Sequence, residues 1–318
     1  MEQKTIYMAP MQGVTEAPFR NAFDKYFGGA DGYYTPFIRW EHQGVRRKDM
    51  RDIDPERNSV ACLVPQLMAG SLEEAEMILP YILEMGYKEV DINMGCAYPM
   101  LTKKKKGCGI LPYPENVADL LRIVDRHPDV SFSVKIRLGL SDKEECLSLV
   151  PLFNSMPLKR IVVHARTGVQ QYDGDCDAEA FARFASVCTH PVLYNGDALT
   201  GKGLEGWLSD ESPAAGVMLG RGLLDEPWKA AEYRSGKVWS REEKILALRN
   251  LHADVLDYYE QNILGGEKQL LTKMKGIWEY LLVSGNKKAR KKIRKAQKMA
   301  DYSEAVGTLI RDIDHHDE

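Results

Sequence analysis

The chain alternates short apolar or β-branched runs with amphipathic helical stretches, and this alternation continues to about residue 235. Eight runs have the length and composition of strands. They are Thr5–Met8, Gly32–Thr35, Val60–Gln66, Glu89–Asn93, Ser131–Arg137, Arg160–His164, Pro191–Tyr194 and Gly216–Leu219. Alternating strands and helices indicate a parallel sheet, and eight such units favour a closed (β/α)8 TIM barrel. An open doubly wound sheet is the alternative, because strand counts from a sequence leave closure undecided.

The pattern changes after Tyr233, and from Arg241 onward the sequence predicts helices alone. Apolar residues such as Leu248, Leu251 and Val255 recur at helical spacing. We therefore predict a barrel over residues 1–237 and an α-helical bundle domain over residues 238–318.

The composition is that of an ordinary globular protein. Of its 318 residues, 44% are hydrophobic and 28% are charged. No apolar run approaches the roughly 18 to 20 residues of a membrane span, and Met1–Pro10 lacks a signal-peptide pattern. The six cysteines show no C-x-x-C pair, which indicates separate thiols in a reducing compartment. We expect a monomeric cytoplasmic protein with no metal ion and no membrane contact.

Functional groups of such barrels follow the C-terminal ends of the strands. Gln66 ends the third run, where its amide can both donate to and accept from a heterocycle. Cys96 follows the fourth run on a glycine-containing loop, and a thiol there can exchange a proton near neutral pH. A structural glutamine and an unreactive free cysteine are the alternatives.

Cationic side chains follow the fifth and sixth runs. Lys135 and Arg137 share one face of their strand by alternation, and His164 and Arg166 follow on the next strand. If that face is the barrel interior, the cations need an anionic or electron-rich partner. A solvated rim is the alternative.

Glycine-rich turns follow the last two runs. Asn195-Gly196-Asp197 comes after the seventh and Gly220-Arg221 after the eighth. A phosphate site at these two loops recurs in TIM barrels, since glycine exposes backbone N–H groups and arginine adds charge. Two ordinary tight turns would give the same pattern.

A strongly basic segment lies near the C-terminus, although the net charge of the chain is −3. Residues 287–298 include Lys291, Lys292 and Lys295 among eight lysines and arginines. Such a helix can neutralise RNA phosphates. A solvated lysine-rich helix face is the alternative.

Taken in order, the motifs resemble those of the tRNA-dihydrouridine synthases over about residues 5–230. The segments that carry the resemblance are Met8-Ala9-Pro10-Met11, Val14-Thr15, Pro18-Phe19-Arg20, Asn93-Met94-Gly95-Cys96, Val134–Gly139, Val163–Thr167, Asn195-Gly196-Asp197 and Gly220-Arg221-Gly222. Residues 34–39 also faintly resemble the second-strand region of the bacterial C-type subgroup.

The resemblance implies an FMN-dependent enzyme in which NADPH or NADH reduces the flavin. Hydride then passes to C6 of a tRNA uracil, while Cys96 gives a proton to C5. The residues implied to bind FMN are Pro10, Met11, Gln12, Gln66, Lys135, His164, Asn195, Gly196, Asp197, Gly220 and Arg221. Those implied to bind the tRNA substrate are Asn93, Arg137, Arg166, Lys291, Lys292 and Lys295. The helical domain then corresponds to a tRNA-binding domain.

The active-site loop departs from the family pattern at two points. The family usually has proline directly after the cysteine, whereas Ala97-Tyr98-Pro99 follows Cys96 here, and Cys108 lies where a small residue is usual. Cys108 is therefore a second candidate thiol. A flavin barrel acting on a small molecule, such as an ene-reductase or a dihydroorotate dehydrogenase, and a catalytically inactive RNA-binding protein are the competing functions.

Overall fold

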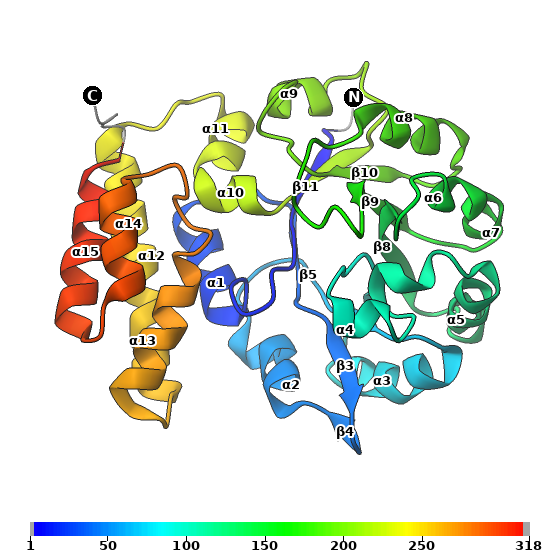
Figure 1. Cartoon of the computed structure of the whole chain (residues 1–318), viewed down its shortest axis with the longest axis horizontal. Coiled ribbons are helices and arrows are strands. Elements are labelled where there is room, and N and C mark those ends of the chain that lie inside the picture. Colours follow the sequence, from blue (N-terminus) through cyan, green and yellow to red (C-terminus); the bar gives the residue numbers. More distant parts are fainter. Residues whose placement is uncertain (1–2, 314–318) are drawn as a thin grey trace. The chain divides into compact units, whose positions relative to one another are not determined.

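The computed structural model describes residues 3–313, and the chain forms two compact units (Figure 1). The barrel unit comprises the chain up to Pro10 together with Asp31–Leu219. The helical unit comprises Met11–Ala30 and the chain from Gly220 onward. The predicted division between residues 237 and 238 lies in the linker before helix α12. The helical unit is larger than the predicted domain, because it also includes Met11–Ala30 and residues 220–237.

The barrel unit is built on a closed parallel sheet, as predicted. Strand β1 pairs with both β2 and β11, and the remaining strands pair in sequence order. One extended segment is interrupted at Pro65, because proline has no N–H to donate. The part before Pro65, β5, pairs with β2, and the part after it, β6, pairs with β7. The strands of the ring are β1 (Thr5–Met8), β2 (Gly32–Tyr34), β5 (Leu63–Val64), β6 (Gln66–Met68), β7 (Glu89–Met94), β8 (Ser131–Gly139), β9 (Arg160–Thr167), β10 (Val192–Asn195) and β11 (Gly216–Leu219).

Two details differ from the prediction. The third strand segment begins at Leu63 rather than Val60 and continues to Met68. A short antiparallel hairpin, β3 (Ile38–Glu41) and β4 (Gly44–Val45), was not predicted. It follows β2 after Pro36 and extends the sheet by pairing Ile38 with Leu67 of β6.

Helices cover the outside of the ring. Those of the barrel unit are α2 (Arg47–Ile53), α3 (Leu72–Glu84), α4 (Pro99–Thr102), α5 (Pro114–Arg126), α6 (Glu145–Ser148), α7 (Val150–Asn154), α8 (Ala178–Val187) and α9 (Gly203–Leu208), with 3-10 turns η1 (Pro55–Arg57) and η2 (Gly107–Ile110). The Ser71 hydroxyl accepts a bond from the N–H of Glu74 and so caps α3. The predicted helices at residues 72–85 and 116–126 are α3 and α5.

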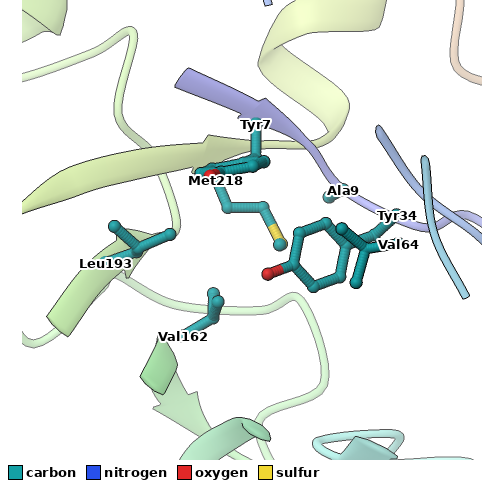
Figure 2. Packing of buried hydrophobic residues seen from close by; sticks show 7 residues of the cluster. All are labelled: Tyr7, Ala9, Tyr34, Val64, Val162, Leu193 and Met218. Carbon is teal, nitrogen blue, oxygen red and sulfur yellow. The ribbon is translucent and has the colours of Figure 1, made fainter. Parts of the chain in front are cut away.

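Side chains fill the interior of the ring, so it is a packed core and not a channel (Figure 2). The cluster draws one residue from each of six strands and one from the start of the loop after β1, since alternate residues of a strand face inward. Its members are Tyr7, Ala9, Tyr34, Val64, Val162, Leu193 and Met218. The rings of Tyr7 and Tyr34 meet edge to face with centroids 5.6 Å apart.

The helical unit contains only helices among its described residues. They are α1 (Ala17–Tyr26), α10 (Arg221–Asp225), α11 (Lys229–Ser235), α12 (Arg241–Asn262), α13 (Gly266–Ile277), α14 (Lys287–Lys295) and α15 (Met299–Arg311). Ser240 and Glu243 form a capping box at the start of α12, and the Asn286 side chain caps α14. Within residues 3–313 no helix is long and apolar enough to cross a membrane.

Candidate active site

Sheet register brings the predicted polar residues of the barrel unit together at the C-terminal ends of the strands. Asn93 of β7 lies opposite Lys135 of β8, and Arg137 lies opposite His164 of β9. His164 in turn lies opposite Asn195 of β10. These residues therefore form one continuous polar rim, as the strand pattern predicted.

A chain of hydrogen bonds runs from the barrel interior to this rim. The fully buried carboxylate of Asp91 accepts a bond from Gln66 Nε2 at 2.7 Å. Gln66 Oε1 accepts from Asn93 Nδ2 at 2.6 Å, and Asn93 Oδ1 accepts from the backbone N–H of Cys96 at 2.9 Å. Asn93 thus positions the thiol-bearing loop directly.

Asp91 is not among the residues predicted for the site. Burial raises the pKa of its carboxyl to about 6, against the lowering effect of hydrogen bonds from Ser133 and Gln66. Asp91 lies two residues before Asn93 and therefore points to the same face of β7. An aspartate at that spacing on a buried strand was the signal available in the sequence.

Cys96 is half-buried, and two further hydrogen bonds hold its loop. The N–H of Cys108 donates to the Cys96 carbonyl at 3.0 Å, and Arg137 Nε donates to the Gly95 carbonyl at 3.0 Å. Burial raises the pKa of the Cys96 thiol above its ordinary value, although the backbone hydrogen bond from Tyr98 and the charges of Arg137 and Lys135 lower it in part. The thiol therefore keeps its proton at neutral pH, which is the state a proton donor needs.

Cys108 packs inside the barrel unit. Its side chain has no exposed surface, and a Cβ added to Gly168 would lie 2.5 Å from its Sγ. Burial raises the pKa of the Cys108 thiol to about 12. Cys108 supports the loop through its backbone and does not present a thiol to solvent, so the geometry favours Cys96 over Cys108 as the reactive residue.

Lys135 and Arg137 both lie at the rim, as their alternation predicted. Lys135 Nζ donates to Asn195 Oδ1 at 2.9 Å, while Asn195 Nδ2 donates to the Met218 carbonyl at 2.7 Å. Burial and the charge of Arg137 lower the pKa of Lys135 to about 8. A cation desolvated in this way is stabilised by an anionic ligand.

Arg166 and Asp197 join the loops after β9 and β10. The Arg166 guanidinium is buried, donates to the Gly174 carbonyl at 2.8 and 3.0 Å and pairs with Asp197. It also lies 3.4 Å from His164 Nε2. Gly196 directly follows β10, and an added Cβ there would lie 2.6 Å from Cys176 Sγ, so a larger residue would displace its neighbours.

The other predicted site residues lie at the end of the barrel unit or in the helical unit. Pro10 is the last residue before the helical unit, and the Met11 N–H donates to Thr15 Oγ1 at 2.8 Å. Gln12 is exposed. Gly220 and Arg221 follow β11 directly, and Arg221 begins α10.

The comparisons with known proteins decide the family. The model of the dihydrouridine synthase (Dus) family matches residues 7–313. The chain belongs to the dihydrouridine synthase family. The predicted enzyme class, an oxidoreductase of tRNA modification, is therefore confirmed.

Curated relatives agree with this membership. The "Probable tRNA-dihydrouridine synthase" of Rhodobacter capsulatus is 27% identical over 259 residues, covering 80% of this chain and 78% of that protein. "tRNA-dihydrouridine synthase B" of Vibrio cholerae is 27% identical over 232 residues, covering 71% of this chain and 70% of that protein. These B-type names do not support the C-type subgroup that residues 34–39 suggested.

Solved structures confirm the predicted fold. Morphinone reductase superposes with a TM-score of 0.52 at 12% identity over 74% of this chain and 87% of its own. A putative dihydrodipicolinate synthase family protein from Coccidioides immitis superposes with a TM-score of 0.50 at 12% identity, covering 98% of this chain and 95% of that one. At such identities the likeness concerns the fold alone.

Proposed function

We propose that the protein reduces the C5=C6 bond of a uridine in tRNA, with FMN as cofactor, NADPH or NADH as reductant and Cys96 as proton donor. The observation that carries the proposal is a half-buried thiol, Cys96, on a rim loop that Asn93 and Arg137 hold through hydrogen bonds, in a member of this family.

The rim fits a flat anionic cofactor. Lys135 is desolvated, and its ammonium group makes one hydrogen bond to the described residues, to Asn195, which leaves N–H groups for a ligand. Gln66, His164, Gly196 and Asp197 complete the part of the cofactor site proposed for the barrel unit. Pro10, Met11, Gln12, Gly220 and Arg221 are proposed from the family resemblance to contact the same cofactor. Bound FMN would supply hydride to uracil C6.

The residues of this chain would then orient the base and move the proton. Cys96 would give its thiol proton to C5 of the uracil and be reprotonated from solvent. Asn93 keeps one amide N–H for a uracil carbonyl, because its other bonds go to Gln66 and the loop backbone. Arg137 holds the loop at Gly95 and would add positive charge near the base. The uridine must leave its stack to reach this site, as substrates of base-modifying enzymes do.

We expect the purified protein to bind FMN and, with NADPH and tRNA transcribed without modifications, to form dihydrouridine at a defined position. Bound FMN is measured from its absorption spectrum, and dihydrouridine by mass spectrometry of tRNA digests. A protein that binds FMN and reduces small enones but leaves tRNA unchanged would instead be a small-molecule reductase. A protein that binds tRNA but takes up no flavin would be an inactive RNA-binding protein.

The basic helix α14 is proposed to bind the tRNA, and residues 238–318 to form the tRNA-binding domain. Lys291, Lys292 and Lys295 are exposed, whereas Ala289 and Ile293 are buried against the rest of the helical unit. Among residues 3–313 these three lysines form no ion pair. A helix face with several unpaired cations suits a phosphate backbone.

Changing Lys291, Lys292 and Lys295 to glutamate is expected to weaken tRNA binding and to flatten its salt dependence. Each lost phosphate contact lowers the slope of log K against log salt by about 0.7 to 0.9. Titrations with fluorescent tRNA at several salt concentrations measure both effects. The triple arginine variant keeps the charge and should bind normally, and flavin reduction by NADPH should be unchanged in both. Equal affinity of the glutamate variant and the wild type would indicate a merely solvated helix face.

A further inference from the structure

The segment directly after the reactive thiol exposes apolar side chains to solvent. The side chain of Tyr98 is 55% exposed and that of Met100 is 64% exposed. Both lie at helix α4, two and four residues after Cys96. A contiguous exposed apolar patch that is rimmed by polar residues is a feature of binding sites.

The same segment carries four consecutive lysines, of which two are engaged. Lys106 pairs with Glu74, and Lys105 Nζ lies 3.8 Å from the centroid of the Tyr113 ring. Lys103 and Lys104 are exposed and form no ion pair with any residue between 3 and 313. Residues 98–106 contain no acidic side chain, so this surface is strongly positive.

The backbone below these side chains is fixed. Leu101 is buried, and its carbonyl accepts a bond from the Lys106 N–H at 3.1 Å. The Thr102 backbone packs so closely on Gly109 that an added Cβ would lie 2.3 Å from the Thr102 oxygen. Tyr98, Met100, Lys103 and Lys104, here called the α4 surface, are thus presented in a set arrangement beside the thiol.

We infer that the α4 surface binds the RNA strand next to the uridine that is reduced. Tyr98 offers a ring face on which a neighbouring base stacks, and Lys103 and Lys104 neutralise the adjoining phosphates. Exposed aromatic rings combined with unpaired cations are the features that single-stranded RNA requires of a protein. The inference rests on the proposed function for the identity of the RNA, and it adds a tRNA contact within the barrel unit to the one proposed for α14.

The charges are tested by changing Lys103 and Lys104 to glutamine in the full chain. We expect about tenfold weaker binding of unmodified tRNA at physiological salt and a slope of log K against log salt that is smaller by about 1 to 2. The control variant changes Lys88 and Arg122 to glutamine, which removes two exposed charges, one directly before β7 and one within α5. Equal binding by the two variants would overturn the role of the lysines.

The ring is tested by comparing Tyr98→Phe with Tyr98→Leu. Stacking needs the aromatic face and not the hydroxyl, so phenylalanine should preserve tRNA affinity while leucine weakens it about tenfold. Flavin content and the rate of flavin reduction by NADPH should stay at the wild-type level in both variants. If the leucine variant bound tRNA as tightly as the phenylalanine variant, the stacking role would be wrong.

Binding and chemistry are measured separately, so failure of the two proposals can be told apart. If tRNA binding depended on salt and on the α4 residues as expected but the wild type formed no dihydrouridine, the role of the α4 surface would be supported and the proposed reaction would be wrong. If the wild type formed dihydrouridine and all α4 variants bound tRNA with wild-type affinity, the proposed reaction would be supported and the inferred role of the α4 surface would be wrong. Absence of any tRNA binding would overturn the inference outright.

Discussion

Replacing Cys96 with alanine should lower the rate of dihydrouridine formation by about 10²- to 10⁴-fold, the range expected when a general acid is lost. The thiol is the group that the loop holds at the rim, and burial raises its pKa. Single-turnover reduction of unmodified tRNA by the flavin-loaded protein measures the effect. Flavin content should not change, because alanine removes only the sulfur.

Cys188→Ala is the matched control, since Cys188 is a half-buried thiol at the C-terminal end of α8. It should react at the wild-type rate. A Cys96→Ala protein that reacted equally fast would show that the proton comes from elsewhere. The pH profile adds a second readout: activity should persist through mildly alkaline pH and fall only as pH rises through the raised pKa of the thiol.

The Gly107→Ala substitution is expected to lower the rate of dihydrouridine formation nearly as much as Cys96→Ala does, although it leaves the thiol in place. Gly107 has a φ of +58°, and an added Cβ would lie 2.3 Å from the Cys96 carbonyl oxygen and 3.0 Å from the Cys96 Cβ. The loop must move to relieve this overlap, and a displacement of about 1 Å at a reacting group can cost about 100-fold in rate. The same single-turnover assay measures the loss.

The Gly86→Ala variant is a control that distinguishes displacement of the Cys96 loop from the strain of placing alanine at a positive φ. Gly86 also has a positive φ, +86°, but nothing lies within 4 Å of an added Cβ. Both variants should lose stability, by roughly 1 to 2 kcal/mol from the unfavourable backbone conformation, while only Gly107→Ala should lose activity. Thermal unfolding of the two proteins provides the comparison. Equal activities would mean that the thiol tolerates movement of its loop.

Strand periodicity was enough to predict the barrel and much of the rim. Lys135, Arg137 and His164 lie where alternation placed them, because the side-chain period of a strand is set by the backbone. The start of α14 was also predictable, since Gly285 and Asn286 interrupt the helical pattern there.

Contacts between distant segments could not be predicted in the same way. The oxygen of Asn93 is bonded to the backbone of the thiol loop, and Arg166 is bonded to Gly174 and Asp197, contacts that strand periodicity does not reveal. The hairpin β3–β4 depends on pairing with β6 nearly thirty residues away, and its short strands carry little local signal. The membership of α1 in the helical unit likewise follows from long-range packing.

The bonds from Asp91 to the thiol loop have one further consequence. A side-chain amide can rotate by about 180° so that its oxygen and nitrogen exchange places. Two amides in contact can therefore form their hydrogen bond with either one as the donor. A carboxylate only accepts, so Asp91 obliges Gln66 to face it with nitrogen, and Gln66 obliges Asn93 to do likewise. One buried anion thereby dictates the polarity of a contact two side chains away, and the loop meets an oxygen as long as that carboxyl is ionised.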